Sequence, residues 1–120
     1  MSQKKVRFLG LIVAAGILTL QACHKRAPNT TATSNHVRAV GVAAQGTALL
    51  LKQPERSIEY YKQAVQLEYD SREWKSELAF AYFKAKRTPE AVPIWQELAQ
   101  GKDDYASQAK RFLVKAGVNQ

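Results

Sequence analysis

Two helix-forming segments of the same pattern lie 34 residues apart in this chain. When residues 57–64 are aligned with residues 91–98 (91 − 57 = 34), Ser57 meets Ala91 and Tyr61 meets Trp95. A fixed period of this length is typical of stacked helical units, each of which buries its apolar face against the next unit. The repeat therefore predicts a short array of helical hairpins.

Signals for helix starts recur in both segments. Pro54 and Pro89 are each followed by an acid. A proline suits the first position of a helix because the N–H it lacks has no partner there, and the acid complements the helix dipole. Two further helix starts are predicted where side-chain oxygens can cap a backbone N–H, at Asp70, Ser71, Asp103 and Asp104.

Helix ends and one helix interruption are also predicted. Gly101 and Gly117 stand where helix ends favour a left-handed residue. Pro93 lies several residues inside the helix that should begin at Thr88. Because proline removes a backbone hydrogen bond and clashes with the preceding turn, we expect a kink or a later helix start at this point.

From residue 37 onward, apolar residues recur at spacings of three and four, which predicts about five amphipathic helices and no strands. The fold class is therefore all-α. The expected inward positions include Ile58, Tyr61, Ala64, Val65, Leu78, Ala81, Tyr82, Val92, Trp95, Leu98, Ala99, Ala109, Phe112, Leu113 and Ala116. In the first hairpin, Leu49, Leu50 and Leu51 either fill the interior or pack on a partner or a second copy of the chain.

These segments resemble tetratricopeptide (TPR) repeats. Leu78, Ala79 and Tyr82 resemble the family's L-G-x-x-Y, and Ala91 with Trp95 resembles its A-x-x-x-F. The first unit matches through Gly46, Ser57 and Tyr61. The resemblance covers residues 38–117 and implies TPR-like hairpins, about two repeats plus a closing helix. It departs from the family at Trp74, one position early, and at the repeat ends, where Tyr69 and Asp103 replace proline. An unrelated five-helix bundle is the alternative.

The amino-terminal segment predicts export. Lys4, Lys5 and Arg7 precede an apolar run over residues 8–20, which is shorter than the ~20 residues of a membrane span. Residues 20–23, Leu-Gln-Ala-Cys, resemble the lipobox of bacterial lipoproteins. The resemblance implies cleavage of a signal peptide over residues 1–22, with diacylglycerol and an N-acyl chain attached covalently to Cys23. An ordinary secretory signal and an uncleaved membrane helix are the alternatives.

After such cleavage the chain carries 18 − 3 = 15 basic and 10 acidic residues, a formal charge near +5. Residues 23–36 contain no large apolar side chain, so we expect a disordered tether before a helical domain over residues 37–120. His24 and His36 have no second cysteine or acid cluster beside them, so we expect no metal site. We expect no other cofactor, and nucleic acid is not an expected partner outside the cytoplasm.

In TPR proteins the first helix of each pair lines a groove that binds a partner. The resemblance implies that the groove residues here are Glu73, Glu77, Phe80, Phe83, Lys84, Ser107, Lys110 and Arg111. Phe80 and Phe83 are the expected apolar anchors, since aromatic residues dominate binding hot spots, although Phe83 is equally expected in the core. Glu77 stands where some TPR domains have an asparagine that binds a terminal carboxylate, so that activity is not implied.

No residue pattern indicates catalysis, because the chain has no paired histidine and nucleophile and no glycine-rich phosphate loop. We therefore expect a lipoprotein that is not an enzyme, anchored by its acyl chains to the periplasmic face of the outer membrane. Its expected function is that of an adaptor for envelope proteins, similar to TPR pilotins, with homo-oligomers possible. The alternative is a structural lipoprotein that binds peptidoglycan or a wall enzyme.

Overall fold

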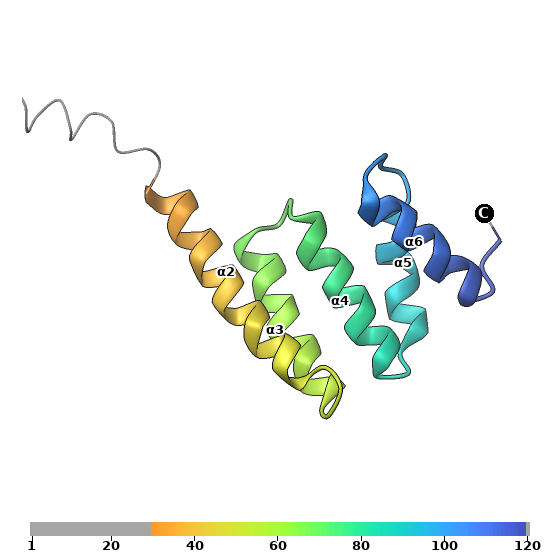
Figure 1. Ribbon diagram of the computed structural model, residues 1–120, viewed down its shortest axis with the longest axis horizontal. Coiled ribbons are helices and arrows are strands. Elements are labelled where there is room, and N and C mark those ends of the chain that lie inside the picture. Colours follow the sequence, from red (N-terminus) through yellow and green to blue (C-terminus); the bar gives the residue numbers. More distant parts are fainter. Residues whose placement is uncertain (1–29, 120) are drawn as a thin grey trace, which may run out of the picture. The chain divides into compact units, whose positions relative to one another are not determined.

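A computed structural model describes residues 30–119 (Figure 1). Contacts divide the chain after Ala32, and the fold described below is that of residues 33–119 with the first residues of α2. The described residues form five helices and no strand, which confirms the all-α prediction. In order they are α2 (Thr30–Leu49), α3 (Pro54–Leu67), α4 (Arg72–Lys84), α5 (Thr88–Leu98) and α6 (Asp104–Lys115). None of these helices combines the length and the hydropathy needed to cross a bilayer.

Helix α2 begins earlier than the sequence predicts. Its first residue is Thr30, seven residues before the expected boundary at residue 37 (37 − 30 = 7), so residues 30–36 of the expected tether are helical. Side chains near this end are mostly exposed, and helix propagation adds one hydrogen bond for each further residue fixed. His36 Nδ1 also lies 2.9 Å from Glu68 Oε1, at the end of α3. This contact connects the extended part of α2 to the rest of the array.

The predicted helix starts are confirmed. Pro54 is the first residue of α3, and α5 begins at Thr88, immediately before Pro89. The Ser71 side chain accepts a hydrogen bond from Trp74 N at 3.3 Å, and Asp103 Oδ1 accepts one from Ala106 N at 2.9 Å. Both side chains therefore satisfy a backbone N–H that the first turn of a helix leaves without a partner.

Pro93 does not delay the start of α5. The helix runs without interruption from Thr88 to Leu98 with Pro93 inside it, so the expected later start is wrong. Proline at this position removes the bond to the carbonyl of Pro89, and both residues are exposed, so water can solvate that carbonyl. Burial of Trp95 and Leu98 on the opposite side favours the continuous helix.

Only one of the two glycines expected to be left-handed has that conformation. Gly117 has φ +74° at the end of α6, as predicted, whereas Gly101 does not have a positive φ. Gly101 instead leaves room for the side chain of Arg72, because a Cβ at this position would overlap with Arg72 Nη2. That nitrogen donates to the Leu98 carbonyl at 2.7 Å and to Asp103 Oδ1 at 2.8 Å. Gly101 therefore permits Arg72 to connect α4 with the α5–α6 turn.

The left-handed residue that ends α4 is Lys86, with φ +64°. The N–H of Arg87 donates to the carbonyl of Tyr82 at 2.8 Å, and that of Lys86 donates to Phe83 at 3.1 Å. This pattern is the Schellman motif, in which glycine is the preferred left-handed residue. Lys86, which is not a glycine, therefore has a strained left-handed backbone conformation.

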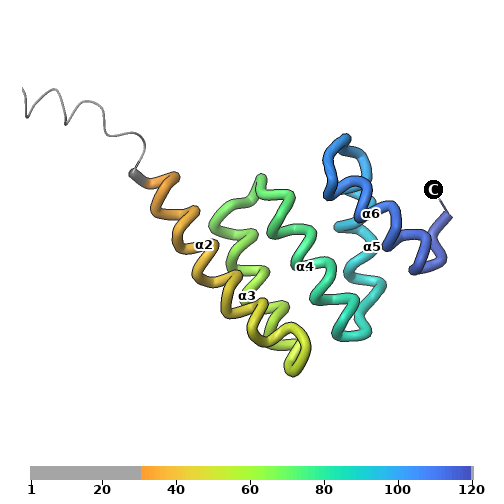
Figure 2. Tube along the Cα trace, in the orientation of Figure 1, coloured from red at the N-terminus to blue at the C-terminus, as the bar shows by residue number. Residues whose placement is uncertain are grey.

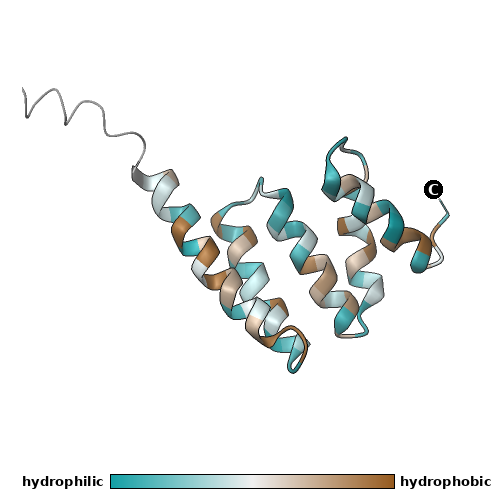
Figure 3. Cartoon of the chain, viewed as in Figure 1, coloured by the Kyte–Doolittle hydropathy of each residue, from teal (hydrophilic) through white to brown (hydrophobic). Residues whose placement is uncertain are grey.

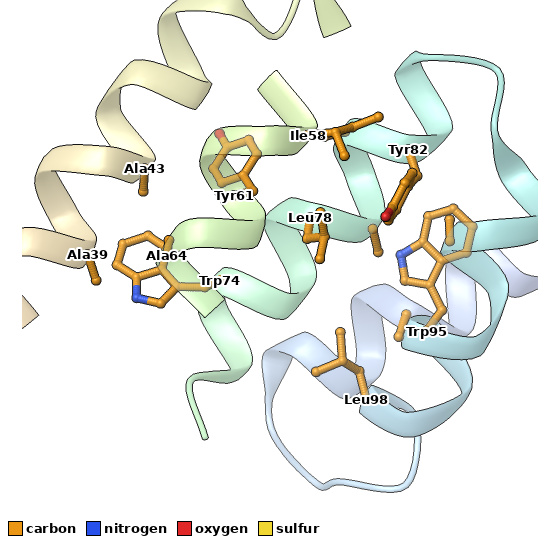
Figure 4. Packing of buried hydrophobic residues seen from close by; sticks show 14 of the residues in the cluster. Ala39, Ala43, Ile58, Tyr61, Ala64, Trp74, Leu78, Tyr82, Trp95 and Leu98 are labelled. Carbon is orange, nitrogen blue, oxygen red and sulfur yellow. The ribbon is translucent and has the colours of Figure 1, made fainter. Parts of the chain in front are cut away.

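The core runs along the whole array (Figure 4). Helix α4 packs against α3 and α5, and α6 packs against α5 with a smaller contact to α4; Figure 2 shows α4 between α3 and α5 along the chain trace. The largest fully buried side chains are Trp95, Tyr61, Ile58, Leu98 and Leu113. The pairing of α2 with α3, α4 with α5, and α6 at the end is consistent with TPR-like hairpins and a closing helix.

Small residues bring α2 close to α3. Ala39 and Ala43 are buried, and a Cβ at Gly46 would lie 3.1 Å from the ring of Tyr61. The Ser57 hydroxyl donates to the Gly46 carbonyl at 2.8 Å. A glycine in this place therefore serves close packing of the two helices.

The three leucines after this contact have different environments. Leu50 packs against the core and Leu49 is half-buried, whereas Leu51 is 80% exposed. Leu50 therefore fills the interior of the hairpin, as one of the two alternatives predicted, whereas Leu51 does not. Hydrophobic residues occur along α2 (Figure 3), where Val37 is 65% and Val40 is 45% exposed.

Candidate interaction face

Helix α4 presents a strip of four residues that its neighbours leave at least partly exposed. These residues are Glu73, Glu77, Phe80 and Lys84. They recur at spacings of three and four, and because successive residues of a helix are rotated by about 100°, this spacing places them on one side of α4. Glu73 and Lys84 are exposed, while Glu77 and Phe80 are half-buried. The structure thus places all four of these predicted site residues on one side of α4.

Phe80 is part of a cluster of four aromatic rings shared by α4, α5 and α6. Phe112 of α6 lies 5.7 Å from Phe80, 5.6 Å from Phe83 and 4.9 Å from Trp95, between ring centroids. The Trp95 and Phe112 rings are stacked, and Phe83 also lies 5.8 Å from Trp95. Aromatic pairs at these distances add about 0.5–1.5 kcal/mol each beyond burial. Phe83 therefore helps to pack three helices together.

Two lysines border this cluster. Lys84 Nζ lies 5.8 Å from the centre of the Phe80 ring, and Lys115 Nζ lies 5.4 Å from that of Phe112. Both distances allow a cation–π attraction. Lys115 was not among the predicted site residues, although it lies one helical turn beyond Arg111, which was.

The other end of the strip is acidic. The Tyr61 hydroxyl, 2.8 Å from Thr47 Oγ1 of α2, is also a hydrogen-bond partner of Glu77. Partial burial raises the pKa of Glu77 above its ordinary value; the Tyr61 hydrogen bond opposes this shift, and the Glu73 carboxylate adds to it. Burial also raises the pKa of Tyr61. Glu77 therefore carries its charge in a less favourable setting than a fully solvated acid.

Most other carboxylates of the described chain have a cationic partner. Arg87 pairs with Glu55 and Glu90, and further cationic partners are found for Glu59, Glu97 and Asp103. Within residues 30–119, Glu73 and Glu77 form no ion pair. Two neighbouring carboxylates on one strip are thus left uncompensated in a chain with excess positive charge.

The predicted residues of α6 do not all lie beside α4. Lys110 is two residues, or about 200°, from Phe112, which places it on the opposite flank of α6. It lines a pocket of about 460 Å³ with residues of α5, the α5–α6 turn, α6 and the carboxyl-terminal segment: Gln96, Ala99, Gln100, Leu113, Val118 and Asn119. Lys110 therefore lies apart from the α6 residues that face α4, and its role in binding stays a prediction. The spacing between Lys110 and the apolar residues of α6 did not determine on which side of the helix Lys110 would lie.

The other two predicted residues of α6, Ser107 and Arg111, are both exposed but lie in different places. Ser107 is exposed and its hydroxyl donates to the Asp103 carbonyl at 3.5 Å, whereas exposed Arg111 shares the side of Lys115. Gln108, which the sequence did not single out, accepts a hydrogen bond from Ser76 of α4 at 2.9 Å. Nothing in the sequence around Gln108 indicates that it connects α6 with α4, and only the folded structure shows this contact.

One side of α2 carries three further exposed residues. Val40, Ala44 and Thr47 fall within a narrow arc of the helix, and all three are exposed. Thr47 contacts Tyr61 of α3, which also interacts with Glu77, so this side of α2 is connected to the strip through that tyrosine. We define the candidate face as Val40, Ala44, Thr47, Glu73, Glu77, Phe80, Lys84, Arg111 and Lys115.

No family model matches this chain, and neither the curated proteins nor the solved structures include a match. The predicted lipidation site, Cys23, lies outside the described residues. Within residues 30–119, no group of three histidine, cysteine or acidic residues is placed to hold a metal ion.

Proposed function

We propose that this protein is a membrane-anchored adaptor that binds another protein through the candidate face. The observation that carries the proposal is the uncompensated pair of Glu73 and Glu77 beside the half-exposed ring of Phe80. Aromatic side chains, and charged groups without an intramolecular ion-pair partner, are the features that a binding surface uses for anchoring and for specificity.

The proposed anchor is an acylated Cys23. Support comes from the basic start, the short apolar run and the Leu-Gln-Ala-Cys sequence that closes it. His24 follows in place of the aspartate that retains lipoproteins at the inner membrane, which favours delivery to the outer membrane. The adaptor would then serve an envelope assembly from the periplasmic face, in the manner of a pilotin for a secretion or pilus channel.

Site-specific photocrosslinking in cells tests this function. Phe80 is replaced by p-benzoylphenylalanine in the full chain, and Tyr69, which is 72% exposed in the α3–α4 turn, receives the same substitution as a matched control. We expect one discrete envelope protein to crosslink from position 80 and not from position 69. The same product from both positions, or none from position 80, would contradict the proposed role of the face.

Fractionation of the Cys23→Ser variant tests the anchor separately. We expect this variant to leave the membrane fraction, because most of the attachment of an acylated chain comes from burial of its CH₂ groups. Unchanged membrane attachment would overturn the lipobox interpretation. Crosslinking to wall material, in place of a protein, would favour a structural lipoprotein that binds peptidoglycan.

A further inference from the structure

Charges on the candidate face are separated along the axis of α4. Glu73 and Glu77 occupy the amino-terminal half of the strip, and Lys84 ends it; Arg111 and Lys115 continue the cationic end on α6. Glu73 and Lys84 are eleven residues apart, which is about 16 Å at the rise of an α-helix. The face therefore has an acidic end and a basic end about three turns apart.

Intramolecular stability does not account for all of this pattern. The helix dipole favours Glu73 in the first turn and Lys84 in the last. Glu77, however, lies in the middle of α4, is half-buried, and has another carboxylate four residues earlier. Like charges at this spacing destabilise a helix. A cation supplied by another molecule would relieve this repulsion.

Apolar surface lies between the charged ends and on α2. Phe80 separates Glu77 from Lys84, and Val40 and Ala44 are exposed on the side of α2 that carries Thr47. An occupant that matches the face must therefore have an apolar middle flanked by one cationic and one anionic end.

On the basis of the proposed function, we infer that the face binds an amphipathic helix of its partner, antiparallel to α4. Lysine or arginine near the carboxyl end of that helix would contact Glu73 and Glu77. An acid three turns earlier would contact Lys84 and Lys115, and apolar residues between them would cover Phe80. Helices ordinarily carry acids near the amino end and bases near the carboxyl end, so the antiparallel direction pairs ordinary charge patterns and opposes the two helix dipoles.

Two synthetic peptides of equal composition test this orientation. Both are 18-residue helices with a leucine and alanine stripe; one has glutamates in its first turn and lysines in its last, and the other has these reversed. Fluorescence anisotropy measures their binding to the full chain in detergent. We expect the first peptide to bind about tenfold more tightly, a difference of 1.4 kcal/mol.

A charge swap on α4 provides the decisive variant. Glu73→Lys combined with Lys84→Glu keeps the net charge and exchanges the two ends of the strip, and both residues are exposed. The matched control, Glu59→Lys with Lys62→Glu, exchanges an ion pair on α3. We expect the α4 swap to abolish or reverse the peptide preference and the α3 swap to leave it unchanged, with circular dichroism verifying that both variants are helical.

Several results would overturn the inference: no binding of either peptide at millimolar concentration, equal binding of both, or a preference that the α4 swap leaves intact. Self-association of the chain that the same swap abolishes would identify a second copy as the occupant instead. If a protein crosslinks from position 80 but the peptides show no preference, this inference fails and the proposed function stands. If the peptides are discriminated but no protein crosslinks, the proposed function fails.

Discussion

Gly41 and Gly46 of α2 allow a direct measurement of how closely α2 and α3 pack. Both lie in the interior of one helix, so alanine at either position gains about 0.8–1.0 kcal/mol in helix propensity. A Cβ at Gly41 meets nothing within 4 Å. A Cβ at Gly46 would lie 3.1, 3.2 and 3.2 Å from three ring carbons of Tyr61.

The ring of Tyr61 has little freedom to move away. Its side chain is fully buried, and its hydroxyl lies 2.8 Å from Thr47 Oγ1. Overpacking of a core costs about 1–3 kcal/mol, which exceeds or matches the gain in propensity. We therefore expect Gly41→Ala to stabilise the protein by about 1 kcal/mol and Gly46→Ala to destabilise it by about 1 kcal/mol.

Thermal unfolding followed by circular dichroism at 222 nm compares the two variants. For a domain of this size, 1 kcal/mol corresponds to a change in Tm of about 4–8 °C. Gly41→Ala should raise Tm by about that amount, and Gly46→Ala should lower it. An equal rise in both variants would refute the reasoning, because the contact with Tyr61 would then impose no steric limit.

Three further outcomes follow from individual residues. Lys86→Gly should stabilise the protein by about 1 kcal/mol, measured by urea unfolding, because it removes a side chain from a left-handed position; a loss of stability would contradict this. The Arg72 guanidinium lowers the pKa of Asp103 to about 2, below the value of the unfolded chain, so this stabilisation should be present above about pH 4 and lost as the pH falls to about 2. Asp103→Asn should remove this part of the acid dependence of Tm. Glu77→Gln should raise Tm at pH 7, since burial raises the pKa of Glu77, and the gain should shrink at pH 4 as the wild-type carboxyl becomes protonated; a gain that grows on acidification would contradict it.

The helices and most of the core were predictable because their signals are local. Pro54, Ser71 and Asp103 mark helix starts through groups within the first turn, and a 34-residue period places Tyr61 and Trp95 at equivalent buried positions. Each of these signals depends on residues within one or two turns, which the sequence displays directly.

What the sequence did not predict depends on contacts between distant segments. Gly101 was interpreted as a left-handed residue, but the group that requires its missing side chain is Arg72, 29 residues earlier (101 − 72 = 29). Lys110 was grouped with Arg111 and Lys115 was not, because the sequence does not show which flank of α6 faces α4. The contact between Phe112 and Phe80 determines that rotation, and it exists only in the folded chain.

The early start of α2 changes what the proposed anchor implies. Seven residue steps separate Cys23 from Thr30 (30 − 23 = 7), so these two residues lie within about 25 Å of each other in any conformation. Glu68 contacts both His36 and Trp74, which places the acidic end of the α4 strip at the same end of the array as the amino-terminal part of α2. A partner helix antiparallel to α4 would thus have its basic end at the same end of the array as His36, and anionic lipid head groups would also attract that basic end if Cys23 is acylated as proposed.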